Sequence, residues 1–326
     1  MGPKVSEEEY IDFLVASPKA YSCVEASRVH PEQGAVSHDA LTRLLHRVEP
    51  SAQALWEEVR TEVEPQGGYL VLDDSTLDKP YARKMELVTH HWSGKHHRVV
   101  KGINLVTLLW TDGDRHLPCD YRVYHKDQDG LSKNDHFASM VDTAASRGFR
   151  PRCVCFDSWY ASTDNLKRID RLRWRWLTRL KGNRQVNPDK RGNVPVDSLE
   201  VPESGRVVHL KGYGFIRVFR TVAQHGRAEH WATNYLEMSE LERLQAAEAS
   251  WRIEQYHQGI KQNCGVERCQ ARSARAQRNH IGMAIRAFCR FERYCFHTGV
   301  SWFEAKQRII RDAVRQYLQN PAYSLP

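Results

Sequence analysis

The stretch Tyr69-Leu70-Val71-Leu72-Asp73-Asp74-Ser75-Thr76 decides the fold of this chain. Four consecutive apolar residues are typical of a strand buried on both faces, and here they lead directly into two carboxylates. Carboxylates are costly inside a core and well placed at the carboxyl end of a strand, where the sheet meets solvent. The stretch therefore predicts a short buried strand over 69–72 that ends at a polar site.

The same pattern returns at Cys153-Val154-Cys155-Phe156, which runs into Asp157-Ser158-Trp159-Tyr160. Two apolar strands that each end in Asp are more informative than either alone. Alternation, caps and stop signals around them predict a hairpin over 99–110 and 116–124, helices over 134–147 and 162–173, and a strand over 174–180.

A later stretch, Trp251 to Lys261, supplies a third carboxylate. Glu254 and Lys261 are seven residues apart, which places both on one face of a helix. A carboxylate suits a divalent cation and a lysine suits a phosphate oxygen, so this face fits a metal-bound phosphodiester. Taken alone, Glu and Lys at this spacing usually form a solvated surface face.

The order of these elements is that of an RNase H-like α/β domain with a β-strand insertion, an N-terminal helical domain and C-terminal helices. In that order the strands ending at Asp74 and Asp157 lie side by side, and the late helix brings Glu254 to them. Three carboxylates can hold two Mg²⁺ ions, with Mn²⁺ as a substitute. The expected domains are 1–64 (helical), 65–185 (first part of the core), 186–233 (β insertion), 234–295 (completion of the core with the Glu254 helix) and 296–326 (helical tail).

The first 60 residues have two interpretations. Ser37 can cap a helix whose Leu41, Leu44 and Leu45 follow helical spacing, so that Arg43 and Arg47 of a helix-turn-helix could read DNA. The segment has 6 basic and 10 acidic residues, which favours a helical cap packed on the main domain. Both interpretations stay open.

The charge of the whole chain, +8 over 326 residues, favours an anionic partner. Positive charge is concentrated at residues 167–191 and 251–326. No apolar run is long enough for a membrane span, and the acidic start lacks the features of a signal peptide. The eight cysteines are expected to be reduced thiols of a cytoplasmic protein. A zinc site at Cys264 and Cys269 with nearby histidines is a weaker alternative, because the spacing matches no usual pattern.

These residues also resemble a known family. Asp73-Asp74-Ser75-Thr76, Phe156 to Tyr160, and Trp251 to Glu254 with Lys261 are similar to the DDE transposases of bacterial insertion sequences, in particular the insertion sequence 4 group and its insertion sequence 701 branch. The resemblance covers roughly residues 69–295. It implies that Asp74, Asp157 and Glu254 are the catalytic, metal-binding triad and that Lys261 contacts phosphate.

The chain departs from the family pattern at two positions before the glutamate. Ala247 and Ser250 stand where the group has Tyr and Arg, which help to hold the transposon end. The resemblance therefore leaves the second-strand chemistry open, and Arg252 is a candidate to replace part of that contact. Asp73 competes with Asp74 as the first ligand; the family pattern favours Asp74.

Further basic residues are candidates for DNA contacts. Arg268, Arg272, Arg275 and Arg278 recur at helical spacing and predict one basic stripe that tracks a DNA backbone. A solvated helix face is the alternative. Arg179, Lys181 and Arg184 follow a predicted strand and are expected to flank the same groove.

The sequence thus predicts a DNA transposase that binds terminal inverted repeats, cleaves them by metal-dependent hydrolysis and joins the 3′ hydroxyl ends to target DNA. Because two ends must be cut together, we expect a homodimer on double-stranded DNA. A nuclease or resolvase without strand transfer, and a non-catalytic DNA-binding protein derived from a transposase, are the alternatives.

Overall fold

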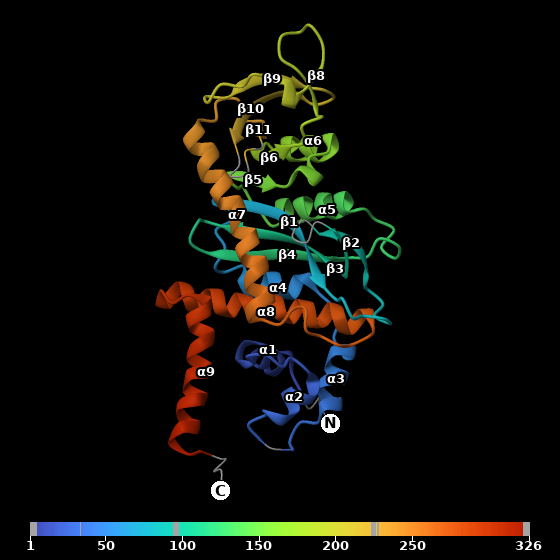
Figure 1. Cartoon of the computed structure of the whole chain (residues 1–326), viewed down its shortest axis with the longest axis vertical. Helices are drawn as coiled ribbons and strands as arrows, with labels where there is room; N and C mark the ends of the chain where they lie inside the picture. The colour runs from blue at the N-terminus through green and yellow to red at the C-terminus, as the bar shows by residue number, and fades with distance from the viewer. Residues whose placement is uncertain (1–4, 33, 94–97, 223–225, 227, 322–326) are drawn as a thin grey trace. The chain divides into compact units, whose positions relative to one another are not determined.

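The computed structural model describes residues 5–32, 34–93, 98–222, 226 and 228–321 (Figure 1). The ends of the first and last expected domains, and positions 223–225 and 227 of the expected β insertion, lie outside these residues. The chain divides into two compact units. The first comprises Met1–Arg60, Thr76–Asn104 and Gln255–Pro326, and the second comprises Thr61–Ser75 and Leu105–Glu254.

The first unit begins with four helices, α1 (Glu7–Ala16), α2 (Cys23–Arg28), α3 (His38–Arg47) and α4 (Ala52–Val59). Each is preceded by a serine whose side chain accepts a hydrogen bond from a backbone N–H of the first turn, which satisfies a donor that has no partner within the helix. The predicted cap at Ser37 and the helix that follows it are confirmed, with Leu41, Leu44 and Leu45 buried.

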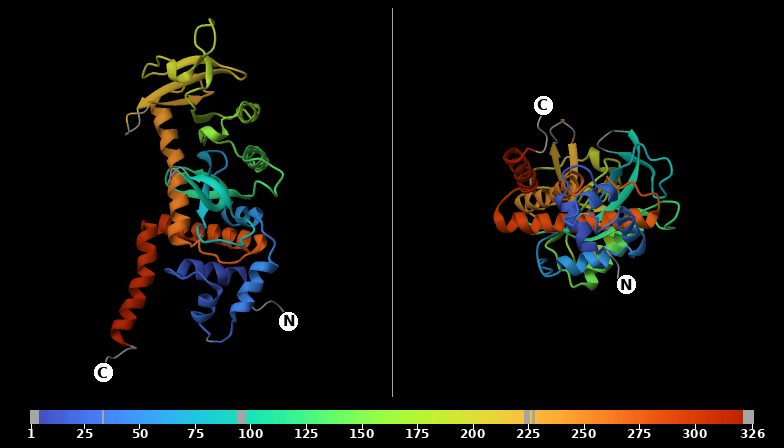
Figure 2. Two further views of the ribbon diagram at one scale, coloured as in Figure 1. Left: turned by 45° about the vertical axis from the view of Figure 1, so that its right-hand side comes forward. Right: turned by 90° about the horizontal axis from the view of Figure 1, so that it is seen from below.

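Two long helices complete this unit, α8 (Ala274–Thr298) and α9 (Trp302–Gln319). α8 packs along α1, α3 and α4, and Figure 2 shows these N-terminal helices beside it. In α9 the buried Lys306 donates hydrogen bonds to the carbonyl oxygens of Val15, 2.5 Å away, and Asn263, 3.0 Å away. Burial lowers the pKa of Lys306 to about 8. In the described residues no helix has the length and apolarity needed to span a bilayer.

His280, in the middle of α8, makes the stability of this unit depend on pH. Its ring is fully buried between the Tyr10 hydroxyl, 3.0 Å from Nδ1, and the Gly265 carbonyl oxygen, 3.0 Å from Nε2. Burial lowers its pKa to about 4, well below the ordinary value of 6.5. Between these values the unfolded chain binds a proton that the folded chain does not, so stability falls as the pH falls.

We expect the free energy of unfolding to fall by about 3 kcal/mol between pH 6.5 and pH 4 through His280. Urea unfolding of the intact chain across this range measures the slope. His280→Gln should flatten it, although this variant starts from a lower stability. Exchange of the exposed His297 for Gln should leave the slope as it is, and an unchanged slope in His280→Gln would contradict the prediction.

The second unit is built on a large mixed sheet, whose strand order is β3-β1-β5-β6-β11-β10-β9-β7-β8, with β4 paired to β3. Its first strands are β1 (Tyr69–Asp78), β3 (Arg98–Thr111), β4 (His116–Tyr124), β5 (Cys153–Phe156) and β6 (Trp176–Leu180). β1 and β5 run parallel, with Tyr69 opposite Cys153 and Leu72 opposite Phe156. β6 lies parallel on the other side of β5. The predicted hairpin and the predicted neighbourhood of the two Asp-terminated strands are confirmed.

The strand predicted over 69–72 is longer than expected, because β1 continues through both aspartates to Asp78. Its far end lies in the first unit, where Gly102 of β3 comes so close that a Cβ there would be 2.6 Å from the Leu77 carbonyl oxygen. A carboxylate can stay within a strand when its backbone is still paired. The short strand β2 (Thr89–Ser93), antiparallel to β3, was not predicted.

The β insertion consists of β7 (Gln185–Asn187), β8 (Val194–Pro195), β9 (Arg206–Leu210), β10 (Gly214–Val222) and β11 (Ala228–Thr233). The strands of the insertion pair antiparallel with one another. β11 also pairs antiparallel with β6, with Thr233 opposite Leu177, so the insertion extends the main sheet.

The helices of this unit are α5 (Lys133–Ser146), α6 (Thr163–Arg171) and α7 (Glu240–Asn263), with short 3₁₀ turns at η1 (Ser158–Tyr160) and η2 (Val196–Ser198). α5 and α6 lie within two residues of their predicted bounds. Gly148, with φ +83°, follows α5, as the stop signal predicted. α7 begins in the second unit, and Glu254 is the last of its residues there.

Candidate active site

Two aspartates follow directly on the last paired residues of β1 and β5. Leu72 and Phe156 are register partners; Asp73 is the next residue of β1, and Asp157 is the first residue after β5. Residues that follow one register pair of parallel strands lie at the same level of the sheet, so both carboxylates belong to one site. The apolar residues before them are almost fully buried and hold this edge in place.

Helix α7 brings the third carboxylate. A carboxylate oxygen of Glu254 and one of Asp73 lie within 4.8 Å of each other. Burial raises the pKa of Asp73 well above its usual range, and the charges of Asp74, Asp157 and Glu254 raise it further. We call Asp73, Asp157 and Glu254 the carboxylate cluster. Oxygen ligands whose burial and neighbouring charges raise the pKa of Asp73 in this way are a set that a divalent cation would stabilise.

Asp74, the aspartate that the sequence favoured, is engaged elsewhere. Its Oδ2 accepts a hydrogen bond from the Lys133 ammonium at 2.7 Å, and its Oδ1 accepts one from the Tyr160 hydroxyl at 2.7 Å. Successive side chains of a strand point to opposite faces, which explains why neighbouring aspartates have different partners. The geometry therefore brings Asp73, and not the expected Asp74, to Glu254.

Lys133 and Tyr160 were not predicted as site residues. Tyr160 is fully buried and stacks on Phe137, with 5.2 Å between ring centroids. Burial and the neighbouring Asp74 raise its pKa well above the usual range, so it remains a hydrogen-bond donor at neutral pH. The only sequence signal for Tyr160 was its place in the stretch Asp157 to Tyr160. Nothing in the sequence connects Lys133 with Asp74.

We expect Tyr160→Phe to lower the free energy of unfolding by about 1–3 kcal/mol, because a hydrogen bond to a charged group is lost while the stacking on Phe137 is kept. Chemical denaturation measures the change. Tyr235→Phe is the matched control, since the described contact of the Tyr235 ring is with the Arg175 guanidinium, 3.5 Å from its centroid. Equal effects of both changes would mean that the hydrogen bond to Asp74 contributes little.

Basic and aromatic side chains surround Asp157. The Arg179 guanidinium lies 4.0 Å from Oδ1 of Asp157 and 3.0 Å from Glu229. The exposed Trp159 has the Lys181 ammonium 5.0 Å and the Lys133 ammonium 5.9 Å from its ring centroids. Of the predicted basic residues, Arg179 and Lys181 thus lie beside the site.

The described contacts of the other predicted residues are with other groups. Arg184 is 3.4 Å from the Thr163 hydroxyl, and Arg252 pairs with Glu248 at 3.5 Å. Lys261 donates to the Thr76 carbonyl oxygen at 2.9 Å and lies 3.6 Å from Glu267, so its ammonium has protein partners. In α3, Arg43 is exposed, whereas Arg47 donates to the Val5 carbonyl oxygen.

The single arginine stripe is wrong. α8 begins only at Ala274, capped by Ser273, so Arg268 and Arg272 lie on the loop before it. Gly265, with φ +63°, ends the preceding helical backbone and makes this loop possible. Arg275 pairs with Glu49 of the first unit, and Arg278 is half-buried.

The cysteines of the weaker zinc alternative lie in a setting that disfavours metal. Cys264 is fully buried, which raises the pKa of its thiol to about 12, and burial also raises the pKa of Cys269. Metal binding needs the thiolate. Both ring nitrogens of His280 already have protein partners.

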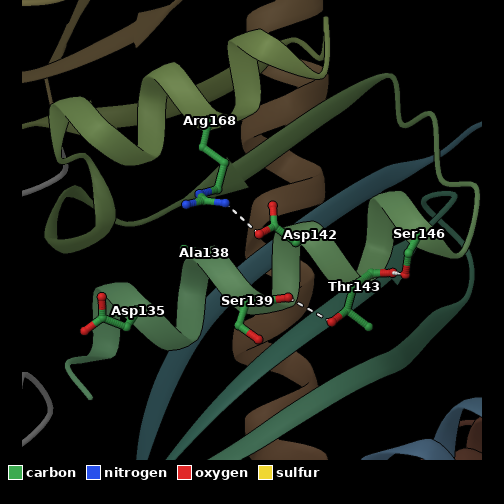
Figure 3. Close-up of a pocket in the computed structure, with 7 residues that line it drawn as sticks. All are labelled: Asp135, Ala138, Ser139, Asp142, Thr143, Ser146 and Arg168. Atoms are coloured by element: carbon green, nitrogen blue, oxygen red, sulfur yellow. Dashed lines mark hydrogen bonds and ion pairs between the residues drawn. The ribbon is translucent and has the colours of Figure 1, made fainter. Parts of the chain in front are cut away.

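A shallow cavity of about 520 Å³ lies on the exposed face of α5, against α6. Figure 3 shows Arg168 of α6 reaching Asp142 of α5, and their atoms are 2.6 Å apart. The other lining residues are small or polar, and none belongs to the carboxylate cluster. We therefore assign no chemistry to this cavity.

Comparisons with known proteins identify a family and a similar fold. The family model described as DDE superfamily endonuclease matches residues 7–259. No curated protein matches the chain. Among solved structures, the chain is similar to a cryo-EM structure of a piggyBac transposase synaptic complex with hairpin DNA, with a TM-score of 0.53 and 12% sequence identity over 99% of this chain and 76% of that chain. At this identity the likeness concerns the fold, which is consistent with an RNase H-like DDE domain.

Proposed function

Because the chain belongs to the DDE superfamily of endonucleases, we propose that it is a transposase that cleaves DNA at the ends of a mobile element and joins the 3′ hydroxyl ends to target DNA. Within the superfamily we propose the insertion sequence 4-like group, on the motif around Glu254. The observation that carries the proposal is the approach of Glu254 to Asp73 within 4.8 Å, at the paired ends of β1 and β5.

We propose Asp73, Asp157 and Glu254 as the metal-binding triad. The family implies divalent metal ions, and the residues present fit them, because the cluster consists of oxygen donors whose mutual repulsion raises the pKa of Asp73. Mg²⁺, as a pair of ions, suits such donors. When bound, the metal supplies charge at the scissile phosphate and lowers the pKa of the attacking water.

The chain's own residues then have distinct roles. Asp73 and Asp157 lie on two strands of one rigid sheet and Glu254 on a helix, which fixes the ligand positions. Lys133 pairs with Asp74 at 2.7 Å and so offsets part of the repulsion that this carboxylate exerts on Asp73. Arg179 and Lys181 place positive charge beside Asp157, where a DNA phosphate would approach. The exposed ring of Trp159 offers a surface on which an unpaired base can stack.

The partner would be double-stranded DNA that carries the sequences bordering the coding region. Since both ends of an element are cut together, we propose that two copies of the chain act on one DNA complex. The family match supports nuclease activity, and the likeness in fold is consistent with it.

A labelled duplex of this bordering sequence, incubated with a supercoiled plasmid and Mg²⁺, tests the proposal. The intact chain should cut the duplex and join it to the plasmid, and Glu254→Gln should do neither. Glu248→Gln is the matched control, because Glu248 lies on the same helix and its side chain is 73% exposed. Cleavage without joining would identify a nuclease or resolvase, and DNA binding without cleavage by the intact chain would contradict the catalytic proposal.

A further inference from the structure

The first unit holds a second, strongly basic cavity of about 540 Å³ between two loops, residues 78–85 and 267–272. Five basic and two acidic residues line it. We call its cationic and aromatic part the basic cradle, which consists of Lys79, Tyr81, Arg83, Lys84, Arg268 and Arg272. Of these residues only Arg268 and Arg272 were predicted to lie together, because the two loops are almost 190 residues apart in sequence.

The two loops are fastened to each other. The buried Lys79 ammonium donates to the carbonyl oxygens of Glu267 at 2.6 Å and Cys269 at 2.8 Å. The Glu86 N–H donates to the Arg272 carbonyl oxygen at 3.1 Å, and the Glu86 carboxylate accepts from the Ala274 N–H at 2.7 Å. The cradle is therefore preorganised, which lowers the entropic cost of binding a ligand there.

The charges of the cradle are available to a ligand. Arg83, Lys84, Arg268 and Arg272 are exposed, and within the described part of the chain none of the four side chains makes an ion pair or a hydrogen bond. Of the two acids that line the cavity, Glu267 accepts from the Asp78 N–H at 3.0 Å and lies 3.6 Å from Lys261. Four guanidinium or ammonium groups around one cavity favour a phosphate ligand.

Tyr81 adds a flat, accessible surface to this charge. The residue is 93% exposed and has no ring contact or side-chain hydrogen bond among the described residues. An exposed aromatic ring amid basic side chains is the combination that binds unpaired nucleotides, since bases stack on the ring while cations hold the phosphates. A duplex would contact the cations through its phosphates but would not stack on the Tyr81 ring, because its bases are already stacked on each other.

We propose that the basic cradle binds an unpaired nucleotide of a DNA strand, with its base on Tyr81 and its phosphates held by the arginines and lysine of the two loops. This inference rests on the proposed function, in which the chain handles DNA ends. It assigns to the first unit a preference for single-stranded DNA next to a duplex. Of the basic residues that the sequence predicted as DNA contacts, only Arg268 and Arg272 belong to this surface.

Fluorescence anisotropy with the intact chain, without divalent metal, tests the cradle. The probes are a labelled duplex with a single-stranded overhang and the same duplex with a blunt end. We expect the overhang to bind about tenfold more tightly, Tyr81→Ala to remove this preference, and Tyr81→Phe to keep it. Arg83→Ala with Lys84→Ala should weaken binding and reduce its salt dependence by roughly 1–1.5 in the log–log slope.

Matched controls distinguish binding at this surface from non-specific electrostatic and hydrophobic binding elsewhere on the chain. Lys19→Ala removes an exposed lysine and Phe303→Ala an exposed aromatic ring elsewhere in the first unit, and both should bind like the intact chain. Circular dichroism establishes that each variant is folded. An equal affinity for both probes, or a preference that survives Tyr81→Ala, would overturn the inference.

The two proposals can fail separately. If the intact chain cleaves DNA and Tyr81→Ala keeps the overhang preference, the inference that the cradle binds a nucleotide is wrong and the transposase proposal stands. If Tyr81→Ala loses the preference while the intact chain never cleaves DNA with Mg²⁺, the cradle is supported and the catalytic proposal is wrong.

Discussion

Asp73→Asn is expected to abolish DNA cleavage and, at the same time, to make the metal-free protein more stable. Cleavage should fall by about 1,000-fold or more, because an amide is a poor ligand for a divalent cation and the charge that the cation supplies is worth several kcal/mol at the transition state. The free energy of unfolding should rise by roughly 1–3 kcal/mol, because the substitution removes a carboxylate that burial and three neighbouring acids destabilise.

Two measurements check this result, a cleavage assay with Mg²⁺ and urea unfolding in the presence of a chelator. Addition of Mg²⁺ should stabilise the intact chain, since a ligand that binds only the folded state adds to its stability, and should have little effect on Asp73→Asn.

Asp74→Asn is the matched comparison at the adjacent position. It leaves Lys133 without its counter-charge, so it should lower stability, while cleavage should persist. The reverse outcome, with cleavage lost in Asp74→Asn and retained in Asp73→Asn, would restore Asp74 as the first metal ligand.

Arg286→Ala should produce the largest loss of stability that we expect from a single change in the first unit, about 3–5 kcal/mol. The Arg286 side chain is only 14% exposed, and its nitrogens lie 2.6 Å from Glu58, 2.6 Å from Glu7 and 3.1 Å from Glu8. Removal of the guanidinium leaves Glu58, itself 15% exposed, as a buried carboxylate with one fewer cation.

Urea unfolding of the intact chain measures this loss, and a second substitution tests its cause. Glu58→Gln in the Arg286→Ala background should recover part of the stability, because the neutral amide costs less to bury. Arg308→Ala, at a side chain that is 51% exposed, should change stability by less than about 0.5 kcal/mol. A similarly small effect of Arg286→Ala would show that the ion pairs of Arg286 with the three glutamates do not stabilise the first unit.

Much of the fold could be predicted from the sequence because its signals are local. The apolar runs before Asp73 and Asp157 predicted two adjacent buried strands, and the serine caps and Gly148 located helix ends. These features depend on backbone hydrogen bonding and side-chain burial within a few residues.

The features that the sequence did not predict depend on partners far along the chain. Whether Asp73 or Asp74 approaches Glu254 is decided by which face of β1 each occupies, and the positions of Lys133 and Tyr160 are set by tertiary packing. The prediction of an arginine stripe was wrong because the four arginines do not share one helix. Gly265 and Ser273 bound a loop that separates Arg268 and Arg272 from α8. Likewise, no local pattern shows that β11 pairs with β6.

The way in which the large sheet ends at β8 bears on how the protein avoids aggregation. β8 is two residues long, and one of them, Pro195, is exposed and has no N–H to offer to another strand. A long, flat edge strand would favour pairing with a neighbouring molecule. A short edge strand that contains a proline offers such a molecule few backbone hydrogen-bonding groups. Copies of the chain can therefore lie close together without joining their sheets at β8, and association is left to other surfaces.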